Sequence, residues 1–461
     1  MTDSAETIAG HHGALGGLQA FVAAYALTLA ALGRSMRATE LAGTASTENV
    51  RVTSLPARFL FRALGLAVLG ASAAIACSHS GSRPTTAPVP PGPPPSASGT
   101  ATAISAGYGH TCALTSAGGV ECWGDNGYGQ LGDGTTADRH SPVAVSGLVS
   151  GVRAIAAGEA LTCAVTSAGA VKCWGDNGYG QLGDGTTADR RSPVAVSGLA
   201  GVRAIAAGEA LGCALTSAGG VKCWGYNRYG ELGDGTTTDH HAPVDVSGLR
   251  SGVTAIAVGY LHVCALTSPG GVKCWGYNRY GQLGDGTMTD RRTPVDVSGL
   301  AGGVTAITAG GGHSCALTRR SGVKCWGSNY LGELGDGTTT RQLTPSAVSG
   351  LASGVAAIAA GGEAHGCALT SAGAVKCWGY NGYGQLGDGT TVNRRSPVDV
   401  SGLPDGVQAI AAGGYGHTCA LTSAGEVKCW GRNSSGQLGD GTLTERRTPV
   451  GVILAWLPGS D

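Results

Sequence analysis

The sequence has few of the residues that most globular cores and most nucleic-acid surfaces use. There are only three Phe in 461 residues, Phe21, Phe59 and Phe61, so everything after them builds its core without Phe. Charged residues make up 13% of the chain, and Lys+Arg and Asp+Glu are both 30, so the formal net charge is zero. A nucleic-acid-binding domain usually shows a basic excess. The composition therefore argues against a nucleic-acid partner.

Short catalytic motifs are also missing. The Gly-rich stretches lack the Gly-Lys-Ser/Thr of a phosphate-binding loop, and G-x-S-x-G and H-E-x-x-H do not occur. What the chain has in excess is glycine, with 82 residues, and helix-rich folds do not tolerate that much Gly. Fifteen Cys is a high count for a cytosolic protein.

A repeat of about 50 residues dominates the chain. Fourteen of the Cys form pairs ten residues apart: Cys112 and Cys122, Cys163 and Cys173, Cys213 and Cys223, Cys264 and Cys274, Cys315 and Cys325, Cys367 and Cys377, and Cys419 and Cys429. Trp-Gly follows the second Cys of each pair. Seven copies span residues 102–455, and a period of this length is typical of a repeat architecture.

Each copy predicts about four short strands. In the first copy, 111–115 and 119–123 alternate like strands, and 116–118 forms a turn in which Gly118 takes a positive φ. Pairing Cys112 with Cys122 places Leu114 and Val120 on the same face as the sulfurs, and Trp123 on the other. Residues 142–145 and 152–156 predict two further strands. Four strands per unit favour an all-β, seven-bladed β-propeller; a solenoid is the alternative, but it needs distinct capping units.

The repeat resembles that of the RCC1 family. The pattern A-G-x-x-H-x-x-A-L-T-x-x-G-x-V-x-x-W-G-x-N-x-x-G-Q-L-G-D-G-T occurs at residues 106–135 and recurs through the chain. The resemblance implies a seven-bladed propeller. The best-known member of the family is a guanine nucleotide exchange factor for a small nuclear GTPase, and a secreted relative inhibits β-lactamases. The regular Cys pairs depart from the cytoplasmic members.

We interpret the Cys pairs as cross-strand disulfides within each hairpin. Each would close a loop of about ten residues and contribute about 2–3 kcal/mol. Seven disulfides suit an oxidising compartment. Zinc ligation and free buried thiols are the alternatives, although zinc usually takes C-x₂₋₄-C pairs that meet in one place.

The fifteenth cysteine, Cys77, resembles the acylated cysteine of a bacterial lipoprotein. A basic stretch from Arg58 precedes the apolar run Ala63–Ala76, which is the length of a signal h-region. Residues 58–77 are therefore predicted to be a lipoprotein-type signal, and 78–101 a Pro-rich spacer. Ser78 after the Cys favours the outer membrane. The expected localisation is the cell envelope, as an outer-membrane lipoprotein or a secreted protein, with membrane contact through the lipid anchor only.

Residues 1–57 form an N-terminal extension before this signal. A signal peptide should begin at the N-terminus, so translation from Met36 is one explanation. The alternative is that Ala14–Gly33, which carries no charge, is a weak membrane segment of its own.

Two recurring polar residues are expected to be structural. His precedes the first Cys by two residues in five copies, at His110, His262, His313, His365 and His417, and Leu161 and Leu211 stand there in the other two. A position that accepts His or Leu is a packing site with an optional hydrogen bond. The Asp of each Gly-Asp-Gly-Thr is expected to bond nearby backbone N–H groups in a turn, rather than to bind calcium.

Divergence between the copies marks candidate binding residues. Tyr and Arg cluster after Trp-Gly and are enriched at protein interfaces: Tyr226, Arg228, Tyr229, Tyr277, Arg279, Tyr280, Tyr330, Tyr380, Tyr383 and Arg432. The alternative is that the Tyr side chains only pack between blades. Basic pairs follow Gly-Asp-Gly-Thr and form either a rim for acidic ligands or, with Asp138, Asp189, Asp239, Asp290 and Glu445, a self-paired rim.

The sequence therefore predicts a non-enzymatic, monomeric propeller with no cofactor or metal, which binds a protein or a glycan through one face. A nucleotide exchange factor and a secreted enzyme inhibitor of the β-lactamase-inhibitor type are the alternatives. A glycan-hydrolysing enzyme would need two carboxylates that converge at the central channel, and the acids that can be placed all repeat around the ring.

Overall fold

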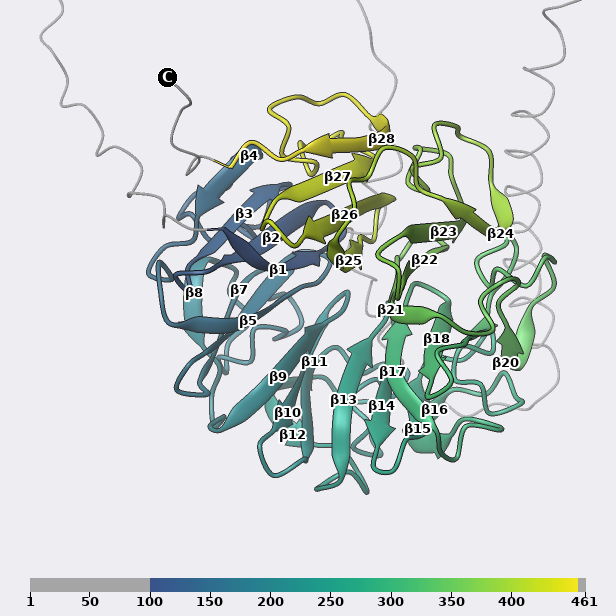
Figure 1. Ribbon diagram of the computed structural model, residues 1–461. Helices are drawn as coiled ribbons and strands as arrows, with labels where there is room; N and C mark the ends of the chain where they lie inside the picture. The colour runs from purple at the N-terminus through teal and green to yellow at the C-terminus, as the bar shows by residue number, and fades with distance from the viewer. Residues whose placement is uncertain (1–99, 455–461) are drawn as a thin grey trace, which may run out of the picture. The chain divides into compact units, whose positions relative to one another are not determined.

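Each repeat folds into one four-stranded antiparallel sheet, and the sheets form a ring around a central axis (Figure 1). The computed structural model describes residues 100–454. The predicted segments 1–57 and 58–77, with Cys77 and Ala14–Gly33, and the spacer up to residue 99 lie outside these residues. Within residues 100–454 there is no helix with the length and hydropathy that a bilayer crossing requires.

The strands follow the chain in order, four to a blade. Blades 1 and 2 contain β1 (Ala101–Ala106), β2 (His110–Thr115), β3 (Val120–Gly124), β4 (Arg139–Ala144), β5 (Val152–Ala157), β6 (Leu161–Thr166), β7 (Val171–Gly175) and β8 (Arg190–Ala195). Blades 3 and 4 contain β9 (Val202–Ala207), β10 (Leu211–Thr216), β11 (Val221–Gly225), β12 (His240–Asp245), β13 (Val253–Val258), β14 (His262–Thr267), β15 (Gly271–Gly276) and β16 (Arg291–Asp296). Blades 5 to 7 contain β17 (Val304–Ala309), β18 (His313–Thr318), β19 (Val323–Gly327), β20 (Gln342–Ala347), β21 (Val355–Ala360), β22 (His365–Thr370), β23 (Val375–Gly379), β24 (Arg394–Asp399), β25 (Val407–Ala412), β26 (His417–Thr422), β27 (Val427–Gly431) and β28 (Arg446–Gly451).

The central hairpin of each blade has the predicted register. Cys112 lies opposite Cys122 and Leu114 opposite Val120, and Gly118 takes a φ of 76° in the turn. The fourth strand was predicted less well, because β4 begins at Arg139 rather than residue 142. The backbone of Arg139 pairs with Gly124 across a register shift that periodicity alone does not reveal.

A disulfide joins the second and third strands of every blade, as predicted. The bonded pairs are Cys112 with Cys122, Cys163 with Cys173, Cys213 with Cys223, Cys264 with Cys274, Cys315 with Cys325, Cys367 with Cys377, and Cys419 with Cys429. The two cysteines of a pair lie directly opposite each other in the ladder, with Cα atoms 4.1 Å apart, and their side chains are buried. The alternatives of zinc ligation and free thiols therefore do not apply to these fourteen residues.

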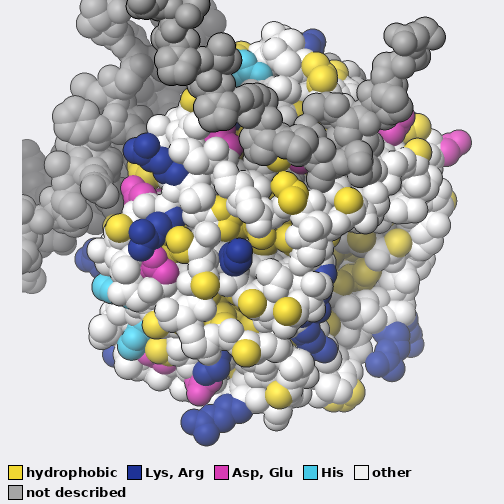
Figure 2. Space-filling view, turned by 90° about the vertical axis from the view of Figure 1, so that its left-hand side faces the viewer, with side chains coloured by type: hydrophobic (Ala, Val, Ile, Leu, Met, Phe, Trp, Pro, Cys, Tyr) yellow, Lys and Arg dark blue, Asp and Glu magenta, His cyan; other side chains and the backbone are white. Residues whose placement is uncertain are grey.

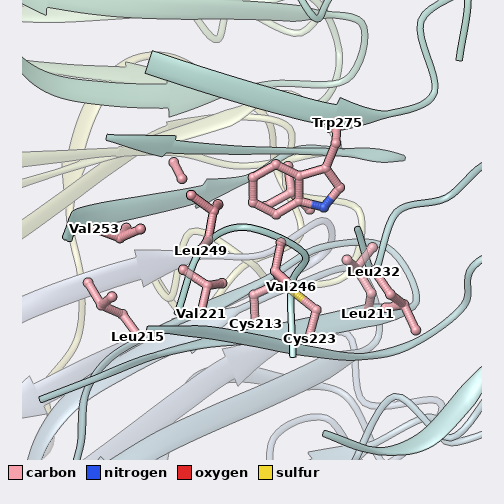
Figure 3. Packing of buried hydrophobic residues seen from close by; sticks show 12 residues of the cluster. Leu211, Cys213, Leu215, Val221, Cys223, Leu232, Val246, Leu249, Val253 and Trp275 are labelled. Atoms are coloured by element: carbon pink, nitrogen blue, oxygen red, sulfur yellow. A yellow bond between two sulfur atoms is a disulfide. The ribbon is translucent and has the colours of Figure 1, made fainter. Parts of the chain in front are cut away.

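A tryptophan joins each blade to the blade before it. Trp275 of blade 4 packs on the face of blade 3 that carries the disulfide, among Leu232, Val246 and other buried apolar residues (Figure 3). Its indole N–H donates to the carbonyl of Glu231 at 2.8 Å. The same bond recurs in every seam, as in Trp174 to Gln130 at 2.9 Å. The hydrophobic core is thus seven separate clusters between neighbouring blades.

The ring closes through a seam of the same kind. Trp123 of blade 1 donates to the carbonyl of Gln437 of blade 7 at 3.0 Å and packs in one cluster with Leu421 and Leu438. Closure excludes the solenoid alternative, because the first and last units cover each other. The first strand of each blade lies innermost, and small residues at the ends of these strands, such as Ala106, Ala157 and Ala412, line a narrow central space of about 80 Å³.

Candidate binding face

One face of the ring carries both sets of variable loops. In an antiparallel meander, the loop after the first strand and the loop after the third strand lie at the same end of the sheet. We call this end the tyrosine face, because the residues that distinguish one blade from another there include Tyr108, Tyr226, Tyr260, Tyr277 and Tyr415.

A buried asparagine holds each of the long loops after the third strand. In blade 1, Asn126 is fully buried; its Oδ1 accepts from the N–H of Leu131 at 3.0 Å, and its Nδ2 donates to Asp133 and to the carbonyl of Ala137. Asp133 in turn accepts from the N–H and the hydroxyl of Thr135 at 2.9 and 2.7 Å. The expected turn role of the Gly-Asp-Gly-Thr aspartate is confirmed. The loops present their outer side chains from a fixed framework.

The same aspartates pair with the basic rim. Arg139 forms an ion pair with Asp133 at 2.7 Å, and the equivalent Arg and Asp of four other blades form an ion pair at almost the same distance. Arginine and the hydrogen bonds of the Thr hold the pKa of these carboxyls below its ordinary value, against the effect of burial. The first Arg of the basic pair is thus paired in these five blades, as one alternative predicted, but its partner is the Gly-Asp-Gly-Thr aspartate rather than one of the predicted acids. The carboxylate of Asp138 instead accepts a hydrogen bond from the backbone N–H of Asn126, so it helps to hold the loop after the third strand. Basic and acidic side chains are correspondingly interspersed on the side of the ring shown in Figure 2.

The recurring histidines are buried, and four of the five link neighbouring blades through a hydroxyl group; the exception is His313, for which the next blade offers Gly366. His110 Nε2 lies 2.8 Å from the hydroxyl of Thr162, and His262 lies 2.8 Å from Ser314 in the same way. Burial lowers the pKa of both imidazoles to about 3, so they are neutral. In blade 2, Leu161 replaces the histidine. The residue that faces it from blade 3 is Gly212, which has no hydroxyl group to bond an imidazole. The packing interpretation is therefore confirmed, and the partner in the next blade explains most of the His/Leu alternation.

Tyrosines form a continuous arc over blades 2 to 5. Successive ring centroids from Tyr179 through Tyr226, Tyr229, Tyr277 and Tyr280 to Tyr330 are 5.0, 6.5, 4.9, 6.1 and 6.4 Å apart, all in edge-to-face arrangement. The packing alternative is confirmed, and the binding role of these tyrosines stays a prediction. The rings do pack from blade to blade, yet Tyr280 and Tyr330 keep 39% and 61% of their surface exposed.

Two exposed arginines accompany the arc. Arg228 and Arg279 occupy the same position in blades 3 and 4, which alone carry the sequence Tyr-Asn-Arg-Tyr. With Tyr229, Met288 and Arg292 they line a pocket of about 370 Å³, where Arg279 lies 3.6 Å from Asp290. On the other side of the ring, Tyr380 packs on Tyr383 and Arg432 lies over Tyr383, 4.9 Å from the ring centroid. The candidate residues thus lie on one face but in two groups.

The inner loops carry site residues that the sequence analysis missed. A Gly follows the first strand of each blade. The residue after this Gly differs between the blades, with one extra Gly inserted in blades 6 and 7: it is Tyr108, Glu159, Glu209, Tyr260, Gly311, Glu363 or Tyr415. Divergence between aligned copies, the signal used for the outer loops, would have found them.

These inner residues converge over the central channel. Tyr108 packs against Tyr415 with centroids 4.9 Å apart and reaches Tyr260 of blade 4 at 5.8 Å. The hydroxyl of Tyr415 donates to Glu159 at 3.1 Å. Burial raises the pKa of Glu209 to about 8, the Glu159 carboxyl adds to the rise, and a hydrogen bond from Tyr260 opposes it. We call Tyr108, Glu159, Glu209, Tyr260, Glu363 and Tyr415 the channel mouth.

The expectation that no acids converge was therefore wrong. Glu159 and Glu209 do not repeat around the ring and meet at the channel mouth. The space beneath them is only about 80 Å³. That is much smaller than the roughly 300 Å³ or more of ordinary ligand pockets, so a sugar ring does not fit there. No group of three or more His, Cys, Asp or Glu within residues 100–454 could hold a metal ion.

The described chain is a closed propeller in which invariant seams carry variable loops on one face. The chain belongs to the RCC1-repeat family: the RCC1-like domain profile matches residues 203–457, and the Regulator of chromosome condensation (RCC1) repeat matches residues 101–130, 152–181, 117–165 and 168–215. It is 35% identical over 351 residues to the ultraviolet-B receptor UVR8 of Arabidopsis thaliana, which covers 75% of this chain and 68% of UVR8.

Other similar proteins match a part of this chain. The probable E3 ubiquitin-protein ligase HERC4 of Homo sapiens is 36% identical over 209 residues, which are 45% of this chain and 20% of HERC4. Among solved structures, human WBSCR16 has a TM-score of 0.62 at 25% identity, covering 68% of this chain and 85% of that one. Yeast RCC1 (Prp20) in its complex with Kap60 has a TM-score of 0.64 at 23% identity, covering 73% and 83%.

Proposed function

We propose that this chain is a non-enzymatic protein-interaction module that binds a partner protein through the tyrosine face. The observation that carries the proposal is the Tyr-Asn-Arg-Tyr pair of blades 3 and 4. Exposed Arg228 and Arg279 flank a pocket beside the tyrosine arc, and the neighbouring blades do not repeat this arrangement. Tyr and Arg are the side chains that most often dominate binding energy at protein interfaces.

The relatives support a protein partner by analogy. UVR8 is named a receptor. A yeast structure of the same fold contains Kap60, and another is titled for the binding of Prp20p to Gsp1p and histones. These partners are proteins, although fold-level likeness alone does not transfer them to this chain. A glycan partner and a β-lactamase-inhibitor activity remain predictions.

The experiment that tests the proposal is affinity capture with the full chain from an extract of its own host. The variant Arg228→Glu/Arg279→Glu reverses charge at the pocket. Arg319→Glu/Arg320→Glu makes the same change on exposed residues of the opposite face and serves as the control. We expect the first variant to lose the captured partner and the second to retain it. Equal capture by both would contradict the use of this face.

We further propose that the protein works in an oxidising compartment of the cell envelope. Seven disulfides support this, because such bonds persist outside the reducing cytosol. Anchoring through acylated Cys77 stays a prediction. Intact mass of the native protein, measured without reductant, should lie about 14 Da below the reduced value and show whether the chain starts at a lipidated Cys77.

Nucleotide exchange on a small GTPase is the second candidate function, favoured by the fold shared with yeast RCC1. A fully reduced cytoplasmic protein that accelerates GDP release from a GTPase of its own cell would support it. An oxidised envelope protein would exclude it.

A further inference from the structure

The channel mouth is one of the places where the ring departs from its sevenfold repetition. Its positions hold Tyr in three blades, Glu in three and Gly311 in one, whereas the seams around them repeat the same Trp and Gly. The side chains come from six different loops, and four of them touch in series, since Tyr108 contacts Tyr415 and Tyr260 while Tyr415 reaches Glu159. Packing of the blades does not require these residues.

A hollow of about 420 Å³ opens beside them on the tyrosine face. It lies where the inner loops offer Gly311, Gly312 and Gly362 instead of side chains. Six tyrosines line it, namely Tyr108, Tyr229, Tyr260, Tyr277, Tyr280 and Tyr415. Among its described lining residues the one charged side chain is Glu363. The volume is that of a small-ligand pocket, and the walls are aromatic.

Carboxyl groups outnumber basic side chains at the channel mouth. Glu159, Glu209 and Glu363 supply three carboxyl groups there, and the one guanidinium recorded beside them is that of Arg432, which lies 3.9 Å from Glu363. The groups that act on Glu209 are Glu159 and Tyr260, and no Lys or Arg is among them. One oxygen of Glu363, Oε2, is buried without a hydrogen-bond partner. A cation placed in the hollow would complement these groups.

Aromatic walls with nearby carboxylates suit one class of ligand. The faces of tyrosine rings attract an organic cation, and the attraction grows when the cation is desolvated. An alkylammonium group also has an apolar stem, which can contact the tyrosine rings while its head meets the carboxylates. An anion would be repelled here, in contrast to the arginine-lined pocket between blades 3 and 4.

We propose that the tyrosine-lined hollow at the channel mouth is a subsite for an alkylammonium group, the end of a lysine side chain carried by the partner protein. This inference rests on the proposed function, because it names the chemistry by which the partner enters the tyrosine face. The exposed arginines further out would contact other, acidic parts of the same partner.

The protonation of the channel mouth gives the subsite a pH dependence. Glu209 is faced by Glu159 from blade 2, Tyr260 from blade 4 and Tyr108 from blade 1, and it acts in turn on Glu231 of its own blade. A bound ammonium favours the ionised carboxylates, so it should displace the proton that burial keeps on Glu209. Binding should therefore strengthen as pH rises from about 6.5 to 9, while lysine itself stays charged.

The experiment titrates the full chain with two blocked pentapeptides, Gly-Gly-Lys-Gly-Gly and its Nε-acetyllysine counterpart, and follows binding by saturation-transfer NMR. We expect the lysine peptide to bind saturably and acetylation to weaken binding about tenfold or more. Glu159→Gln/Glu209→Gln should weaken the lysine peptide by about the same factor. Glu426→Gln, a matched change on the opposite face, should not. Unchanged near-UV circular dichroism shows that each variant is folded.

Two results would overturn the inference. One is no saturable binding of either peptide, or equal binding of both. The other is lysine binding that survives Glu159→Gln/Glu209→Gln in a folded protein. Both are distinguishable from failure of the proposed function. Capture of the partner can still depend on Arg228 and Arg279 when the lysine peptide does not bind or binds no better than its acetylated counterpart.

Discussion

The seams between the blades and the loops at the channel mouth belong to the same seven sheets, but the residues of the seams repeat from blade to blade and those of the channel mouth differ. Every seam repeats a buried Trp that donates to a carbonyl of the preceding blade, as Trp326 does to Gln282 at 2.9 Å. The channel mouth places Tyr, Glu or Gly at equivalent positions of the same sheets. Residues that repeat hold the ring together, and residues that differ on a rigid framework are available for recognition.

The largest expected effect is at a seam. Trp275→Ala removes a fully buried indole from the cluster of blades 3 and 4 and leaves the carbonyl of Glu231 without its donor. We expect the free energy of unfolding to fall by about 3–5 kcal/mol. Denaturant unfolding measures it, with Tyr330→Ala as an exposed control. A loss no larger than that of the control would contradict the seam as the main source of stability.

Removal of one disulfide should cost less. Cys213→Ala/Cys223→Ala removes a disulfide between two residues that are only ten positions apart in the sequence. We expect a loss of about 2–3 kcal/mol, because a loop of this size restricts the unfolded chain only modestly. Comparison of the variant with the wild type, in the absence of reductant, gives the value. Equal stability would mean that this bridge is absent in the native protein.

These two predictions concern features that could be predicted from the sequence alone. The seven units, the hairpin register and the Cys pairing follow from spacing and from alternation along Cys112–Trp123, because each is a local property. The role of the recurring His was predicted, but its hydroxyl partner lies in the next blade, so ring closure had to be known first. The convergence of Glu159 with Glu209 and Tyr415 was missed for the same reason. Residues more than 200 positions apart meet only after the ring has closed.

A change inside the channel mouth tests whether its tyrosines are held in place. A Cβ on Gly414 would overlap the ring of Tyr108. Gly414→Ala should therefore displace that ring and cost about 1–3 kcal/mol. Gly302→Ala is the matched control, since a Cβ there meets open space at an ordinary φ. Equal unfolding curves for the two variants would show that Tyr108 is free to move.

The carboxyl of Glu209 should make stability depend on pH. Its folded pKa, raised to about 8 by burial and by Glu159, lies above the ordinary 4.5, so the folded state binds the proton more tightly than the unfolded state. This contribution is fully present below about pH 4.5 and is lost as pH rises toward 8. Glu209→Gln should reduce the decline by about 1–2 kcal/mol in unfolding measured between pH 5 and 9, while Glu231, whose pKa burial also raises to about 8, keeps its own share. A decline of the same size in both proteins would contradict the assignment to Glu209.

The smallest effect on folding is expected where the largest effect on binding is proposed. Arg228 and Arg279 are exposed, and the one ion pair there, Arg279 with Asp290, is long at 3.6 Å. Surface pairs of this kind contribute about 0–1 kcal/mol. Arg228→Glu/Arg279→Glu should therefore unfold within about 0.5 kcal/mol of the wild type while it loses the partner. If the variant instead lost stability like Trp275→Ala, these arginines would belong with the seams, and the division between repeated structure and variable recognition would fail at the residues on which the proposed function depends.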